Sequence, residues 1–171
     1  MTYHTALDVS LRTASICIIY ETYLKLDKQA RDMAREDPVC QRLMTAPGVG
    51  PVTALTFKAG VDDPARFKRS RTVAAHFGLT PRRFQSGEVD NTGHISKAGD
   101  PDVRSALYVA AHSLVVRSAE WSSLKAWGMR LAKTKGHHCA MIAMARNLAV
   151  ILHRMWRDGT DFQYGSTEAV L

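Results

Sequence analysis

A short turn between two apolar segments, Pro47-Gly48-Val49-Gly50-Pro51, restricts the fold of this chain more than any other feature. Apolar residues flank it on both sides at helical spacing, which predicts two short helices joined by a tight reversal. Glycine tolerates positive φ and has no Cβ, so Gly48 and Gly50 allow another group to approach the backbone closely. Pro51 suits the first turn of the second helix.

This turn has a chemical consequence at the start of the second helix. Free N–H groups and the positive end of the helix dipole converge there, which suits a phosphate. The pattern is typical of a helix-hairpin-helix, a motif that holds a nucleic-acid backbone without reading its sequence. It predicts Gly48, Val49 and Gly50 as binding residues. A turn between two core helices is the alternative.

The composition sets broad limits on the chain. Its 171 residues, 46% of them hydrophobic, are enough for one packed domain. A net charge of +7 favours a polyanionic partner. There is no basic and apolar leader and no long apolar run, so we expect neither a secretion signal nor a membrane span. Three scattered cysteines fit a reducing cytoplasm.

The N-terminal residues favour strands. β-branched and apolar runs predict strands over 3–9 and 14–20 with a turn at 10–13, which makes a β-hairpin. A hairpin alone is marginal in water. A highly charged helix is expected over 21–37.

The rest of the chain favours helices. We expect helices over 39–45, 52–59 and 72–77, with Ser70 capping the last of these. Residues 82–95 form either a short hairpin or a loop. Asp100 and Pro101 are expected to start a helix, followed by an amphipathic segment over 121–135 and a long helix over 137–157. Trp121, Trp127 and Trp156 are interpreted as core residues. The expected fold is mainly α.

Basic side chains gather after the turn. The predicted phosphate contacts are Arg66, Lys68, Arg69, Arg71, Arg82, Arg83 and Lys97. Phe67 and Phe84 lie within these basic segments and are candidates for contact with nucleic acid. A solvated basic surface is the alternative interpretation.

Four motifs occur in a fixed order along the chain. They are Leu7-Asp8-Val9-Ser10, the Pro47–Pro51 turn, Phe77-Gly78-Leu79-Thr80-Pro81, and Gly93-His94-Ile95-Ser96-Lys97-Ala98-Gly99-Asp100 before an alanine-rich helix. In this order and spacing the chain resembles transposases of the IS110/IS116/IS902 insertion-sequence family, from about Gln41 to about Arg157.

The resemblance implies DNA transposition by a site-specific DNA recombinase. In such proteins an N-terminal RuvC-like domain holds a divalent metal through four acids, and a serine of the C-terminal domain attacks the DNA phosphodiester. Asp8 matches the first acid and Ser96 matches the serine. The resemblance also implies Mg²⁺, DNA and, as in some members, a guide RNA encoded by the element. Assembly into a homo-oligomer is expected as well, since an unsupported hairpin over 3–20 exposes apolar surface.

The alternatives without a catalytic role are that Ser96 closes a turn and that Asp8 lies at the end of a strand. His94 is a candidate base for Ser96, with an ordinary loop histidine as the alternative.

The chain departs from the family in its N-terminal part. A RuvC-like domain needs a larger sheet and three further acids, yet the charged helix begins at Glu21. We therefore expect a RuvC-like β-hairpin remnant over 1–20, a linker helix over 21–40, a C-terminal transposase domain over 41–160, and a tail over 161–171. Asp8 is then an orphaned metal ligand, so catalysis by this chain alone is expected to fail. The alternative function is a non-catalytic DNA-binding module that competes with full-length transposase.

Overall fold

The computed structural model describes residues 11–86 and 89–165 of the chain. Within these residues it contains seven α-helices: α1 (Leu11–Glu36), α2 (Pro38–Met44), α3 (Pro51–Val61), α4 (Arg71–His76), α5 (Pro101–Val116), α6 (Ser123–Lys135) and α7 (His137–Asp158). A 3₁₀ turn, η1 (Pro64–Arg66), precedes α4, and two antiparallel strands, β1 (Pro81–Ser86) and β2 (Val89–Ile95), separate α4 from α5. The expectation of a mainly α fold is confirmed.

Aspartate and proline place several of the helix starts. Asp37 accepts hydrogen bonds from the N–H groups of Val39 and Cys40, and Pro38 follows it at the first helical position. Asp63 and Asp100 cap η1 and α5 in the same way. An aspartate at this position satisfies N–H groups that have no partner within the helix.

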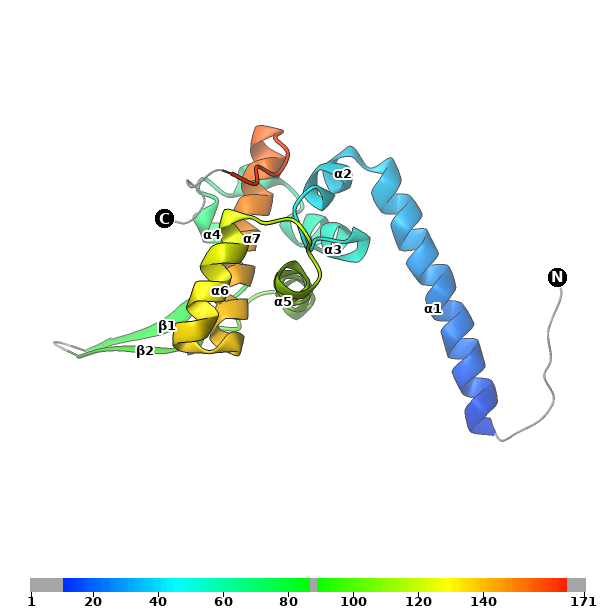
Figure 1. Cartoon of the computed structure of the whole chain (residues 1–171), viewed down its shortest axis with the longest axis horizontal. Coiled ribbons are helices and arrows are strands. Elements are labelled where there is room, and N and C mark those ends of the chain that lie inside the picture. The colour runs from blue at the N-terminus through cyan, green and yellow to red at the C-terminus, as the bar shows by residue number, and fades with distance from the viewer. Residues whose placement is uncertain (1–10, 87–88, 166–171) are drawn as a thin grey trace.

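The long helix α7 forms the centre of the core. It packs against α4, α5 and α6, touches α2, and buries Met141, Met144, Leu148 and Leu152 (Figure 1). Gly128 of α6 faces Met144, and a Cβ at this position would lie 2.0 Å from the Met144 sulfur. The glycine therefore lets α6 approach α7 closely, in line with the tight packing of protein interiors.

The helix α1 extends away from this core. Figure 1 shows its N-terminal turns standing clear of the other helices, whereas its C-terminal part contacts α2 and α3 and includes the buried Ala34. The predicted strand over 14–20 is wrong, because these residues belong to α1. Among the described residues, β1 and β2 pair only with each other, so neither supports a strand there, and a helix satisfies its backbone groups locally. The partner strand over 3–9 lies outside the described residues.

The hairpin alternative for residues 82–95 is confirmed. Strands β1 and β2 pair from Pro81 opposite Ile95 to Ser86 opposite Val89, with an irregularity between Pro81 and Arg83. The pair projects from the helical body as a two-stranded ribbon (Figure 1). Its base therefore lies at the body, beside the segment that carries Ser96.

The tryptophans differ in their surroundings. Trp127 and Trp156 are half-buried against the core, as expected, but Trp121 is 65% exposed. The interpretation of Trp121 as a core residue is wrong, because α6 begins at Ser123 and Trp121 lies in the preceding turn. No described helix is both long and apolar enough to cross a bilayer.

Candidate nucleic-acid interface

Two of the four sequence motifs meet in space. The loop over residues 96–100, here the Ser96 loop, follows β2 and lies against residues 77–80, which follow α4. Ser96 N–H donates to the Thr80 carbonyl (2.9 Å) and Lys97 N–H donates to the Gly78 carbonyl (3.1 Å). The sequence motifs are therefore the two halves of one structural unit.

Glycine makes this contact possible. Gly78 has φ +67°, and a Cβ there would lie 2.2 Å from the Ala98 carbonyl oxygen. Gly99 has φ +77°, and its Cβ would lie 2.0 Å from the His76 carbonyl oxygen. A side chain at either position would have to push backbone atoms apart, because both the space and the φ angle favour glycine.

Arg104 of α5 fastens the two segments together. One of its guanidinium nitrogens, Nη1, donates to the carbonyls of Phe77 (3.1 Å) and Ala98 (3.3 Å). No sequence motif predicted this role for Arg104. The signal was its place directly after the Ser96 motif, at the fourth residue of the helix that Asp100 caps.

Ser96 is half-buried at the foot of the hairpin. Its carbonyl accepts a hydrogen bond from Arg82 Nη2 (3.0 Å), and its Oγ accepts one from the Ala98 N–H (3.5 Å). The second contact is the turn-closing bond expected of a loop serine. Among the described side chains, no carboxylate or imidazole is hydrogen-bonded to Ser96 Oγ. The loop therefore positions the hydroxyl without supplying a base.

Lys97 next to it has an unusual backbone. Its φ is +54°, a left-handed conformation that costs a non-glycine residue of order 1 kcal/mol. The hydrogen bond from Lys97 N–H to Gly78 helps to hold this conformation, and the Lys97 side chain is exposed. A cation thus stands directly beside Ser96.

A second group of cations lies in the loop over residues 66–71, here the basic loop. Its exposed basic residues are Arg66, Lys68, Arg69 and Arg71. Phe67 is half-buried, and its ring contacts the rings of His76 (centroids 5.3 Å apart) and His153 (5.6 Å). Phe67 therefore anchors the loop to the body through its ring contacts, and the contact of Phe67 with nucleic acid stays a prediction.

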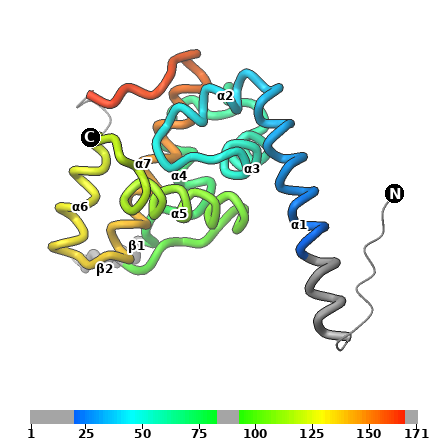
Figure 2. The backbone as a smooth tube through the Cα atoms, turned by 45° about the vertical axis from the view of Figure 1, so that its right-hand side comes forward, coloured from blue at the N-terminus to red at the C-terminus, as the bar shows by residue number. Residues whose placement is uncertain are grey.

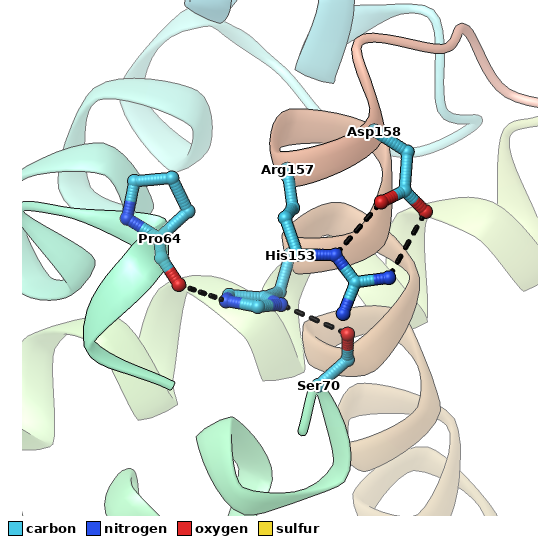
Figure 3. A network of polar contacts seen from close by, with 5 residues as sticks. All are labelled: Pro64, Ser70, His153, Arg157 and Asp158. Carbon is cyan, nitrogen blue, oxygen red and sulfur yellow. Dashed lines mark hydrogen bonds and ion pairs between the residues drawn. The ribbon is translucent and has the colours of Figure 1, made fainter. Parts of the chain in front are cut away.

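The buried His153 of α7 holds the basic loop at Ser70 and the preceding segment at Pro64 (Figure 3). Its Nε2 lies 3.0 Å from the Pro64 carbonyl and its Nδ1 lies 2.9 Å from Ser70 Oγ. A carbonyl can only accept, so we assign the proton to Nε2, and Nδ1 accepts from the Ser70 hydroxyl. The expected capping bond from Ser70 to α4 is not made, because its hydroxyl is directed to His153.

The electrostatic surroundings keep this imidazole neutral. Burial lowers the pKa of His153 and the nearby Arg157 lowers it further, while the Pro64 hydrogen bond and Asp158 act in the opposite direction. Arg157 itself donates to Asp158, with Nε 2.7 Å from Oδ1 (Figure 3). The hydrogen bond from Arg157 lowers the pKa of Asp158.

The Pro47–Pro51 turn is directed mainly into the protein. Gly48 has φ +83°, and a Cβ there would lie 2.4 Å from the Ala110 carbonyl oxygen of α5. Val49 is buried. Gly50, the N-cap of α3, has φ −97° and open space around its Cβ position. Of the three predicted binding residues, only Gly50 faces open space, whereas the close approach at Gly48 serves the packing on α5.

The remaining predicted site residues lie partly outside the described structure. Asp8 lies outside the described residues. Arg83 and Phe84 belong to β1, but the structure does not describe their side chains. In the described part of the chain, no three His, Cys, Asp or Glu side chains gather closely enough to hold a metal ion. The described residues therefore do not fit a Mg²⁺ site.

Together these features define a basic helical domain that places a serine loop at the foot of a projecting hairpin. A family model described as the IS116/IS110/IS902 transposase family matches residues 40–126. The chain therefore belongs to this transposase family.

Individual relatives agree with the family model. A Sinorhizobium fredii protein is 34% identical over 146 residues, 84% of this chain and 38% of its own length. The transposase for insertion sequence element IS1111A of Coxiella burnetii is 33% identical over 127 residues, covering 74% of this chain and 35% of that protein. The IS110 43.6 kDa protein of Streptomyces coelicolor is 26% identical over 150 residues, covering 88% and 36%. The chain thus spans little more than a third of the length of these relatives.

Proposed function

We propose that this chain is the DNA-holding part of an IS110-type transposase, with Ser96 as the residue that would attack the DNA backbone. The observation that carries this proposal is the Ser96 loop, which two glycines and Arg104 fix at the foot of the hairpin beside the Lys97 cation. The exposed cations of the basic loop supply charge for phosphate contacts that do not depend on sequence.

The hairpin is the part of this surface that fits a groove of DNA. A two-stranded ribbon is narrow enough for the major groove, and β1 and β2 project from the body without covering helices (Figure 1). Arg82 and Arg83 lie near its base. We propose that the ribbon enters a groove while the basic loop contacts the adjoining phosphates.

The proposed chemical step is a transesterification. Ser96 Oγ forms a bond to phosphorus, and the bond from phosphorus to one strand's ester oxygen breaks. The hydroxyl proton passes to a base, and the leaving oxygen takes up a proton. The phosphodiester is exchanged for a phosphoserine ester, so the strand can be rejoined by the reverse reaction.

The same geometry explains why the chain alone should bind DNA without cutting it. A serine hydroxyl is a weak nucleophile without a base or a metal. The described residues place neither a base on Ser96 Oγ nor a cluster of carboxylates beside it. We therefore propose that cutting requires an intact family transposase as a partner protomer, and that alone the chain competes for the same DNA.

Covalent capture tests the proposal. The purified chain is incubated with labelled element-end DNA in Mg²⁺, alone and with a full-length family transposase whose own serine is replaced. We expect salt-sensitive binding in both cases and a protein–DNA adduct only in the mixture. The adduct should disappear with Ser96→Ala and persist with Ser105→Ala, a matched change at an exposed serine of α5. An adduct that survives Ser96→Ala would remove Ser96 from the mechanism, and an absence of DNA binding would overturn the proposed function.

A further inference from the structure

A surface pocket of about 290 Å³ is formed by α6, α7 and the C-terminal segment over residues 160–164. This volume is at the lower end of the range for ligand sites, which suits one small group. Its apolar lining comes from Leu124, Ile151, Met155 and Phe162. The first three are buried core residues, so the floor of the pocket belongs to the rigid part of the fold.

The wall formed by the C-terminal segment is tied to the body at several points. Phe162 N–H donates to Thr45 Oγ1 (3.0 Å), and Ser123 N–H donates to the Tyr164 carbonyl (3.5 Å). The rings of Phe162 and Tyr164 meet edge to face, with centroids 4.9 Å apart. These bonds keep the C-terminal segment beside the start of α6 (Figure 2).

Two exposed aromatic residues are close in sequence to residues that line the pocket. Trp121 is 65% exposed and lies two residues before Ser123, which lines the pocket. Tyr164 is 37% exposed. Exposed aromatic side chains beside a cation are the surfaces on which unpaired nucleobases stack.

The charges at the pocket suit a nucleotide. Arg154 lines it, is exposed, and forms no ion pair with any carboxylate that the structure describes. Asp158, which also lines the pocket, is paired with Arg157 and interacts electrostatically with Arg154 as well. Asp161 lies 3.8 Å from Arg42 Nε, which is too long for a hydrogen bond, so its carboxylate keeps free acceptor capacity. The lining thus offers a cation for a phosphate and an acceptor for an amino group.

We infer that this pocket receives a single unpaired nucleotide of a nucleic-acid strand. The base lies against the aromatic and apolar lining, Arg154 meets the phosphate, and the free acceptor of Asp161 favours a base with an exocyclic amino group. A paired base cannot enter, because its faces are stacked and its edge is already hydrogen-bonded. The inference rests on the proposed function for the presence of nucleic acid, and it adds recognition of an unpaired position, which the basic loop and hairpin do not provide.

The experiment compares binding of labelled duplexes with and without one extrahelical adenine, in DNA and in RNA, by fluorescence anisotropy with the full chain at fixed salt. We expect the bulged duplex to bind at least about fivefold more tightly than the perfect one. Arg154→Gln and Phe162→Leu should each abolish this preference while changing perfect-duplex affinity less than twofold. Arg146→Gln is the matched control, since Arg146 is an exposed arginine of α7 outside the pocket lining.

The possible outcomes separate this inference from the proposed function. A preference confined to the RNA arm or to the DNA arm identifies the source of the nucleotide, and either result supports the inference. Equal binding of bulged and perfect duplexes overturns it, as does an equal loss of preference with Arg146→Gln. If the wild-type chain does not bind the perfect DNA duplex, the proposed function is contradicted. The inference depends instead on the ratio of the affinities for the bulged and the perfect duplex. A 5-iodocytosine placed at the bulge, which carries an exocyclic amino group, should crosslink to the peptide containing residues 160–164. A crosslink confined to other peptides also overturns the inference.

Discussion

His153 Nδ1 and Ser70 Oγ lie 2.9 Å apart although 83 residues separate them in the chain. Through this bond the central helix α7 fixes the last part of the basic loop, and through the Pro64 carbonyl it fixes the residues before the loop. The backbone that bears the cations of the basic loop is therefore held in place by a buried, neutral imidazole. Protonation of His153 and loss of its partner Ser70 should therefore both change the free energy of unfolding.

Ser70→Ala should destabilise the protein. The substitution leaves His153 Nδ1 buried without a donor, which costs about 1–3 kcal/mol in the free energy of unfolding. Urea denaturation followed by circular dichroism measures the change. Ser105→Ala, at an exposed serine, should stay within about 0.5 kcal/mol of the unsubstituted chain. Equal stability of the two variants would show that the His153 bond does not hold the loop.

The free energy of unfolding should fall as the pH drops from about 7.5 to about 5. The pKa of His153 is lowered in the folded protein, so over this window the unfolded chain binds more protons and stability is lost on acidification. One such group contributes at most about 1.4 kcal/mol per pH unit. Urea denaturation across this range should show a shallower slope for His153→Gln, which removes the titrating ring. An unchanged slope in that variant would assign the pH dependence to other groups.

The helix ends were predictable because their causes are local. An aspartate followed by proline starts α2, η1 and α5, and for α5 the sequence indicated this start at Asp100 and Pro101. The strand predicted over 14–20 is wrong because strand formation, unlike a helix end, has a non-local cause. Strand formation depends on a partner, and β-branched composition alone does not show whether one is present, whereas the described residues 14–20 belong to α1.

The candidate site was predictable only in part. Ser96 and Gly78 each stood out in a motif, but their contact depends on how α4 and α5 pack, which a sequence pattern does not give. The expectation for Trp121 is wrong because the amphipathic segment expected over 121–135 begins two residues before the helix α6 does. The N-cap Ser122 ends that periodicity, and the residue before it need not face the core.

Gly78→Ala should loosen the Ser96 loop. The new Cβ would lie 2.2 Å from the Ala98 carbonyl at a φ of +67°, so we expect a loss of more than about 2 kcal/mol in the free energy of unfolding. Gly50→Ala is the matched control, because its φ is −97° and its Cβ position is open. Thermal and urea denaturation of both variants provide the measurement. Similar losses in the two would contradict the close packing at Gly78.

Lys68→Gln should weaken DNA binding to all sequences alike. Each phosphate contact that is lost lowers the slope of log affinity against log salt by about one unit. Lys28→Gln removes the same charge from the exposed surface of α1, which leads away from the body, and should leave the slope unchanged. Filter binding at a series of salt concentrations measures both slopes. If the two variants behave alike, the basic loop acts only through net charge.

Trp121→Ala should weaken the binding of single strands without unfolding the protein. The side chain is 65% exposed, so its removal should change the free energy of unfolding by less than about 0.5 kcal/mol. A stacked base contributes at least about 1 kcal/mol, so the affinity for a short single strand should fall about fivefold or more. Fluorescence anisotropy with a labelled 12-mer measures the affinity, and Trp121→Phe should restore most of it because the ring still offers a flat face. A loss that phenylalanine does not rescue would indicate that Trp121 acts through the shape of the turn before α6 and not by stacking.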